Sequence, residues 1–183
     1  MSTIIADRAL PSNIEAERSV IGAILLDNGA INVTASTIGA RDFFRDAHRR
    51  IFDKMVKLVE RGDAIDLVTL KEELGCSGDL EEVGGPAYIA SLVDGVPRSM
   101  NVEHYARIVK EKARLRDIIF AGNKLISAAY EATDAASAII DDHVQSVLSL
   151  AEASGEEAVR IGDEAIGYVL SLDHPDHSGE MAT

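Results

Sequence analysis

The most informative part of the sequence for the fold is NVEHYARIVKEKARLRDIIFAGNKLISAAYE, residues Asn101–Glu131. It contains no proline, and it is longer than the roughly three to four turns of an average globular helix. Its apolar residues recur three or four positions apart, which is the spacing of one face of an α-helix. We therefore expect one long amphipathic helix. Its apolar stripe consists of Ile108, Leu115, Ile118, Ile119, Gly122, Leu125, Ile126 and Ala129.

A second amphipathic stretch follows after a few residues. It reads DAASAIIDDHVQSVLSLAEAS, and its apolar positions Ile140, Val144, Val147 and Ala151 are spaced 4, 3 and 4 apart. Thr133 or Asp134 can serve as its N-cap, since short oxygen-bearing side chains favour that position. Because the connection is so short, the two helices must fold back on each other as an antiparallel hairpin.

A hairpin of two helices cannot bury the whole of its own apolar surface. The rest of the chain has its own core residues, so we expect a second copy to cover the hairpin in a two-fold symmetric dimer. The residues expected at this contact are Leu115, Ile118, Ile119, Leu125, Ile126, Ile140, Val144 and Val147.

The residues before the hairpin predict a compact helical head over 12–99, preceded by an N-terminal extension over 1–11. Ser12 and Glu15 have the spacing of a capping box at the start of the first helix. Further short helices are expected in INVTASTI, RDFFRDAHRRIFDKMVKLVERGD, DLVTLKEELG and PAYIASLVDGVP.

The remaining residues complete the expected domain plan. The hairpin should occupy residues 100–153, and a linker with one short helix and a polar tail should occupy 154–183. Strand signals are weak along the whole chain, because alternating apolar and polar positions are rare. The predicted fold class is all-α: a compact helical head, a long antiparallel helical hairpin and a C-terminal linker.

Composition and charge exclude several classes of protein. The net charge is −13, and residues 131–183 hold one basic residue against 12 acidic ones. Since nucleic-acid affinity depends on cations placed against phosphates, we expect little direct nucleic-acid binding. The single cysteine, Cys76, excludes an internal disulfide and favours a reducing compartment. The apolar run VIGAILL is too short to span a membrane, so we expect a soluble, cytoplasmic protein with no membrane partner.

No pattern of catalytic residues is present. None of the 14 glycines begins the G-x-x-x-x-G-K-[ST] motif of a phosphate-binding loop. His174 and His177 could ligate a metal, but they flank Pro175 in a polar tail that offers no rigid scaffold. We therefore expect no catalytic residue, no metal and no cofactor, with a metal-dependent enzyme kept as the alternative.

Two groups of cations are candidates for binding a partner protein. Residues 41–61 carry seven cations against four acids. Each group is either a solvated helix face or a docking surface for an acidic segment. The second group consists of Arg107, Lys110, Lys112, Arg114 and Arg116.

Five stretches closely resemble the N-terminal domain of DnaB-type replicative DNA helicases, in the order and spacing of that family. They are IEAERSVIGAILLD, DFFRDAHRRIF, AIDLVTLKEEL, GDLEEVGGPAYIASLVDGVP and NVEHYARIVKEKARLRDII. The resemblance covers roughly residues 11–153. The stretch IGDEAIGYVLSL is similar to the linker helix of the family, which packs on the motor domain of a neighbouring subunit.

The resemblance implies a function in DNA replication. It implies that N-terminal domains pair through their hairpins and form a trimer-of-dimers collar on a hexameric ring. This collar receives the C-terminal helicase-binding domain of primase, with a helicase loader as a further partner. The family's RecA-like ATPase domain, with its ATP and Mg²⁺, would follow the linker, so the present chain is expected not to act as an enzyme alone. The alternative is a free-standing helical adaptor or regulator that binds a helicase or primase.

Overall fold

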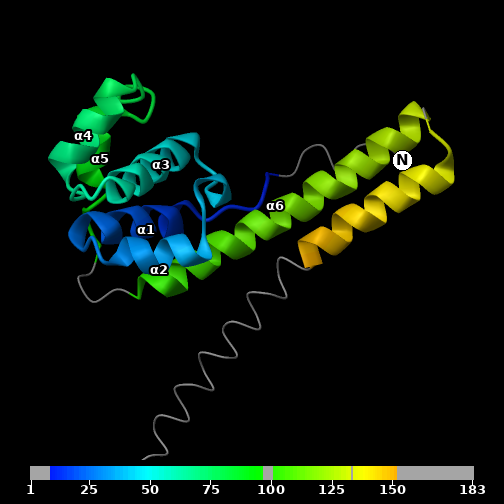
Figure 1. Cartoon of the computed structure of the whole chain (residues 1–183), viewed down its shortest axis with the longest axis horizontal. Helices are drawn as coiled ribbons and strands as arrows, with labels where there is room; N and C mark the ends of the chain where they lie inside the picture. The colour runs from blue at the N-terminus through cyan, green and yellow to red at the C-terminus, as the bar shows by residue number, and fades with distance from the viewer. Residues whose placement is uncertain (1–8, 97–100, 133, 152–183) are drawn as a thin grey trace, which may run out of the picture. The chain divides into compact units, whose positions relative to one another are not determined.

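The computed structural model describes residues 9–96, 101–132 and 134–151 (Figure 1). All regular elements in these ranges are helical, which confirms the all-α prediction. The elements are α1 (Ile14–Leu26), α2 (Ala30–Thr37), the 3₁₀ turn η1 (Ala40–Asp42), α3 (Asp46–Glu60), α4 (Leu67–Cys76), α5 (Gly85–Ser91) and α6 (Val102–Glu131). Residues 136–151 form a further helix. The expected linker helix and Thr133 lie outside the described residues.

The chain divides into two compact units, residues 1–117 and residues 118–183. The division falls inside α6, which therefore contributes its first half to the head and its second half to the hairpin. The hairpin is seen in Figure 1, where the helix over 136–151 runs back along α6.

The core of the head lies between α1 and α3. Val20, Ile21 and Ile24 of α1 are buried, as are Phe52 and Met55 of α3. The apolar period of each segment therefore faces the same core, as helical spacing requires. Other buried residues of the head include Phe43, Ile65, Leu70, Leu74, Val83, Ile89 and Leu92.

The start of α1 differs from the predicted capping box. The N-cap is Asn13 rather than Ser12, and its Oδ1 accepts a hydrogen bond from the backbone N–H of Ala16 at 3.0 Å. An N-cap side chain must lie directly before the first helical residue to reach the third N–H, and helical backbone begins at Ile14. The prediction placed the cap one residue too early.

A close approach fixes α5 against α1. A Cβ atom on Gly22 would lie 2.2 Å from the carbonyl oxygen of Leu92 and 2.7 Å from a methyl group of Val96. A larger residue at this position would force the end of α5 away from α1. Arg18 strengthens the same junction by donating to the carbonyl of Ser91 at 3.0 Å.

Polar side chains fix the entry to α4. Asp66 caps this helix, because its carboxylate accepts from the N–H groups of Val68 and Thr69. The amide of Asn28 both donates to and accepts from the backbone of Ile65, each at 2.6 Å. The loop after α1 is thereby held against the loop before α4.

The first half of α6 completes the head. Ala106, Val109 and Ala113 are buried on one face of the helix, and their small size allows a close approach. At the end of this half, the guanidinium of Arg116 donates to the carbonyl oxygens of Pro11 and Asp42 at 2.9 and 2.5 Å.

Candidate protein-interaction site

One side of the hairpin is apolar and exposed to solvent. Ile118 and Ile126 of α6 are 59% and 42% exposed, and Ile140 and Val144 of the second helix are 58% and 46% exposed. Val147 continues the row on the second helix and is also exposed. We call these five residues the apolar face. All five belong to the set predicted to contact a second copy.

The two helices of the hairpin touch through a different set of residues. Leu125 of α6 is half-buried, and on the second helix the half-buried positions are Ile139, His143, Ser146 and Leu150. Ile139, His143 and Ser146 each come one residue before a member of the row Ile140, Val144 and Val147, and Leu150 comes one turn after that row. The two rows therefore occupy different sides of the helix. The remaining predicted contact residues, Leu115 in the head half of α6 and Ile119 in the hairpin half, are half-buried.

A groove of about 410 Å³ lies between the two helices beside the apolar face. It is lined by Ile118, Ala121, Gly122, His143, Val147, Leu150 and Ala151. A Cβ atom built on Gly122 would have no neighbouring atom within 4 Å. The groove is therefore a shallow apolar trough over bare helix backbone, with the imidazole of His143 as its only titratable group.

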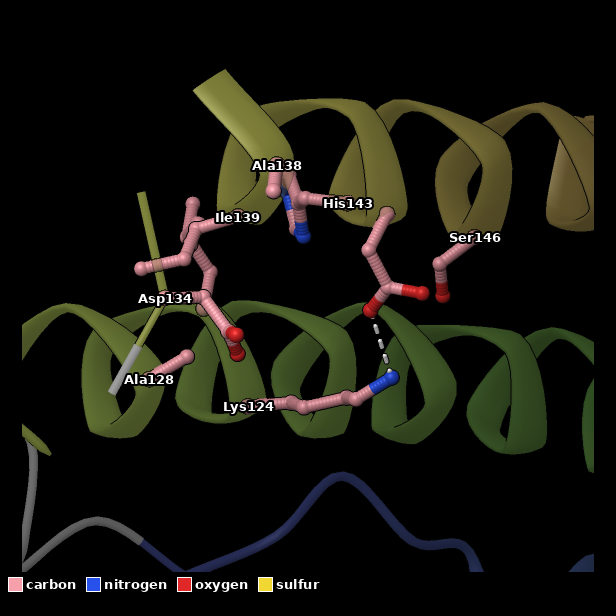
Figure 2. Close-up of a pocket in the computed structure, with 9 residues that line it drawn as sticks. Lys124, Ala128, Asp134, Ala138, Ile139, His143 and Ser146 are labelled. Atoms are coloured by element: carbon pink, nitrogen blue, oxygen red, sulfur yellow. Dashed lines mark hydrogen bonds and ion pairs between the residues drawn. The ribbon is translucent and has the colours of Figure 1, made fainter. Parts of the chain in front are cut away.

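A second hollow of the hairpin, of about 230 Å³, is lined by both apolar and charged side chains (Figure 2). The side chain of Lys124 extends along α6, and its ammonium group donates to the carboxylate of Asp142 on the second helix at 2.8 Å. This hydrogen bond lowers the pKa of Asp142 below its usual value. The lining also includes Asp134 and Ser146, so charged groups gather at this hollow while the apolar face holds none.

The cations predicted on α6 have unequal surroundings. Arg107 is exposed and lies 3.7 Å from Glu103, one turn earlier. Lys110 is mostly buried and forms an ion pair with Asp42 at 3.1 Å. Lys112 and Arg114 are half-buried. The structure brings none of these into a single exposed cluster among the residues it describes.

Arg116 differs from the docking residue that the sequence suggested. It is 4% exposed, and both of its hydrogen bonds above go to backbone carbonyls of the head. Burial lowers the pKa of its guanidinium, and the negative charge of Glu17 opposes this effect. A side chain held in this way ties α6 to the head and is not offered to a partner.

The cations of α3 are largely paired within the head. Arg50 contacts Asp46, Asp79 and Glu82, and Lys54 contacts Asp79. Because these cations already have acidic partners within the head, the contacts favour a solvated helix face for residues 41–61 over a docking surface. The pairs at Lys57 and Arg61 also lie on the surface of the head.

Sequence reasoning missed a buried polar cluster in the head. His48 is fully buried, and its Nδ1 lies 2.7 Å from Glu17 while its Nε2 lies 2.7 Å from the hydroxyl of Tyr88. The carboxylate of Glu17 also accepts from the backbone N–H groups of Phe44 and Arg45. His48 is the third residue of α3 and is followed by charged residues, so its position in the sequence gives little sign that the side chain is buried. The available signal was a glutamate at a core-facing position of α1.

The described residues contain no group of three or more His, Cys, Asp or Glu side chains that could hold a metal ion. His174 and His177 lie outside those residues. Within the same ranges, no helix combines the length and the apolar content that a membrane span requires.

Comparisons with known proteins give one consistent result. The family model of the DnaB-like helicase N-terminal domain matches residues 9–111. The replicative DNA helicase DnaB of Geobacillus stearothermophilus is 38% identical over 152 residues, which are 83% of this chain and 34% of that protein. The replicative DNA helicase DnaC of Bacillus subtilis is 34% identical over 158 residues, 86% of this chain and 35% of that protein. The chain thus spans about a third of the length of these curated relatives.

Solved structures show the same fold. The N-terminal domain of DnaB helicase from Mycobacterium tuberculosis is 34% identical with a TM-score of 0.72, covering 76% of this chain and 99% of that one. A DnaB-like replicative helicase, described together with its interactions with primase, is 20% identical with a TM-score of 0.62, covering 81% of this chain and 35% of that one. Since the family model matches more than half of the residues and the mycobacterial domain is matched almost completely, this chain belongs to the family of DnaB-like helicase N-terminal domains.

Proposed function

We propose that this chain forms the N-terminal collar of a replicative DNA helicase. In this role, copies of the chain pair through the apolar face of the hairpin, and the assembled collar receives primase during DNA replication in the cytoplasm. The observation that carries the proposal is the exposure of Ile118, Ile126, Ile140, Val144 and Val147 on one side of the hairpin.

Pairing through this face has a physical driving force. Fully burying an isoleucine or valine side chain stabilises by roughly 1.5–3 kcal/mol, so covering a side chain that is half exposed contributes about 1 kcal/mol. Each helix contributes exposed members of this face, and Ile118 of α6 and Val147 of the second helix line the groove over Gly122. A second hairpin presents an identical face, and a two-fold axis lets each face cover the other.

The domain plan follows from this proposal. Residues 12–99 would form the head, 100–153 the pairing hairpin, and 154–183 the linker toward the motor domain of a whole helicase. Three pairs would assemble into a trimer of dimers on a hexameric ring. ATP hydrolysis and unwinding would belong to the motor domain, and a helicase loader is a further candidate partner.

The pairing is tested by the mass of the purified chain in solution. Light scattering and sedimentation over a concentration series should show a dimer in equilibrium with monomer. Val144→Asp should raise the dissociation constant by roughly 100-fold or more, because the pair would bury an uncompensated charge. Circular dichroism should show unchanged helix content, since Val144 is exposed in the single chain.

The matched control is Gln145→Asp, which adds the same charge at the neighbouring exposed position outside the apolar face. It should leave the dissociation constant within about twofold of the original, as surface substitutions usually do. A chain that stays monomeric at every concentration, or a Val144→Asp variant that pairs normally, would contradict the proposal.

A further inference from the structure

Gly122 occupies a position that the single chain does not explain. It lies in the interior of α6, where glycine destabilises a helix relative to alanine. Its backbone is not among the left-handed glycines, so the conformation does not require glycine. A Cβ atom would meet nothing within 4 Å, so packing within the chain does not require it either.

The surroundings of Gly122 indicate what the missing side chain makes room for. Gly122 is part of the groove of about 410 Å³, between Ile118 on α6 and Val147 on the second helix. Both neighbours belong to the apolar face and are exposed. The absence of a Cβ atom therefore deepens the groove at the centre of a surface that already favours an apolar occupant.

We infer that the bare backbone at Gly122 is the socket for an apolar side chain of a second copy of this chain. The inference rests on the pairing proposed above and specifies where the two copies come closest. A helix surface without a side chain lets another helix approach more closely and gain more dispersion contacts.

The size of the face favours a second copy as the occupant. The helix over residues 136–151 is about 24 Å long at about 1.5 Å per residue, and two helices side by side are roughly 20 Å wide. Their flat projection is therefore about 500 Å², and the accessible surface of the side chains exceeds the projection. A specific interface buries roughly 800 Å² per partner, which is of the same order. A single short peptide would leave much of such a face uncovered.

The test is Gly122→Ala, whose two expected effects have opposite signs. Alanine favours helix, so the thermal midpoint of the monomer at low concentration should rise. The added methyl group should obstruct the socket, so the dissociation constant of the dimer should rise about tenfold, which equals about 1.4 kcal/mol. Gly122→Leu should weaken pairing further, because the larger side chain fills the groove.

Gly75→Ala is the matched control. Gly75 lies in α4 of the head, and a Cβ atom there would also meet nothing within 4 Å. This variant should raise the thermal midpoint and leave the dissociation constant unchanged. A stabilised Gly122→Ala variant that pairs as tightly as the original chain would contradict the inference that Gly122 receives a side chain of the second copy.

The outcomes separate the two proposals. If the original chain pairs and both Gly122 variants pair equally well, the inference about Gly122 is wrong, and the proposed pairing through the apolar face is still supported. If the original chain never pairs, both are wrong, and the occupant of the groove is not a second copy. If Gly122→Ala and Gly122→Leu weaken pairing in that order and Gly75→Ala does not, the socket is supported.

Discussion

At the scale of single residues, the most consequential group is the cluster of His48, Glu17 and Tyr88. Glu17 accepts from two backbone N–H groups, so its remaining capacity suits a donor at Nδ1 of His48. Nε2 of His48 then accepts from the hydroxyl of Tyr88, whose oxygen accepts from Arg45 at 2.9 Å. This single direction of hydrogen bonding satisfies each buried polar atom and ties α1, α3 and α5 together.

Removing one hydroxyl tests this cluster. Tyr88→Phe should lower the free energy of unfolding by about 1–3 kcal/mol, because Nε2 of the buried His48 loses its partner. Urea denaturation followed by circular dichroism measures the change. Tyr130→Phe is the control, since Tyr130 is 85% exposed and its hydroxyl can bond to water. Equal stability of the two variants would show that the cluster contributes nothing.

At the scale of elements, the connection between α3 and the loop after α4 depends on Asp79. Its carboxylate accepts from Ser77 at 2.7 Å and from Arg50 at 2.5 Å, and Lys54 lies 3.3 Å away. The hydrogen bond from Ser77 and then that from Arg50 lower the pKa of Asp79 to about 2. An unfolded aspartate has a pKa of about 3.9.

The depressed pKa predicts an acid-dependent contribution to stability. The unfolded chain binds a proton at Asp79 first as the pH falls, so this stability is complete above about pH 4 and is lost toward pH 2. Asp79→Asn should lower the free energy of unfolding at pH 7 by about 1 kcal/mol, a value reduced by solvent screening. It should also remove part of the fall in stability between pH 4 and 2.

Urea midpoints at pH 7, 4, 3 and 2 provide the measurement. Asp94→Asn, at an exposed carboxylate of the same head, is the control and should leave the pH profile unchanged. A parallel pH profile for Asp79→Asn and the original chain would mean that Asp79 does not hold the depressed pKa.

The hairpin helices also show what sequence periodicity can and cannot predict. The spacing in the hairpin predicted both helices correctly, and the row that it assigns to a second copy is exposed in the single chain. It did not predict that Ile139, His143 and Leu150 would form the contact within the hairpin. Apolar residues stand in both rows of the second helix, at Ile140, Val144 and Val147 in one and at Ile139 and Leu150 in the other, so periodicity alone cannot choose the rotation of the helix. The predicted N-cap of α1 was wrong for a related reason. Ser12 and Asn13 are both good caps, so the residue types alone cannot choose between them.

At the scale of the whole molecule, the candidate surface for primase remains a proposal from the family. Arg107 is the exposed cation on the head half of α6, and it lies 3.7 Å from Glu103, one turn earlier. If an acidic segment of the primase helicase-binding domain docks there, Arg107→Glu should weaken binding by about 5-fold or more, since charge pairs at interfaces contribute on the order of 1 kcal/mol. Calorimetric titration of that primase domain into the chain measures the effect.

Lys57→Glu is the matched control for the primase measurement. Lys57 is exposed on α3 and forms the same kind of one-turn pair with Asp53. If both charge reversals weaken primase binding equally, the effect comes from the overall charge of the chain and not from docking at Arg107. If neither reversal weakens binding, the docking surface lies elsewhere.

The amino-acid sequence alone was enough to predict that the chain is all-α, where most of its helices lie, and that two of them form a hairpin with an apolar row on each helix. Helical period and short connections carry that information locally. The burial of His48 and Arg116 is visible only in the folded chain, because each depends on partners many residues away: Glu17 and Tyr88 for the first, Pro11 and Asp42 for the second. The rotation of the second hairpin helix also came from the tertiary structure, because apolar residues stand in two rows and packing against α6 selects one.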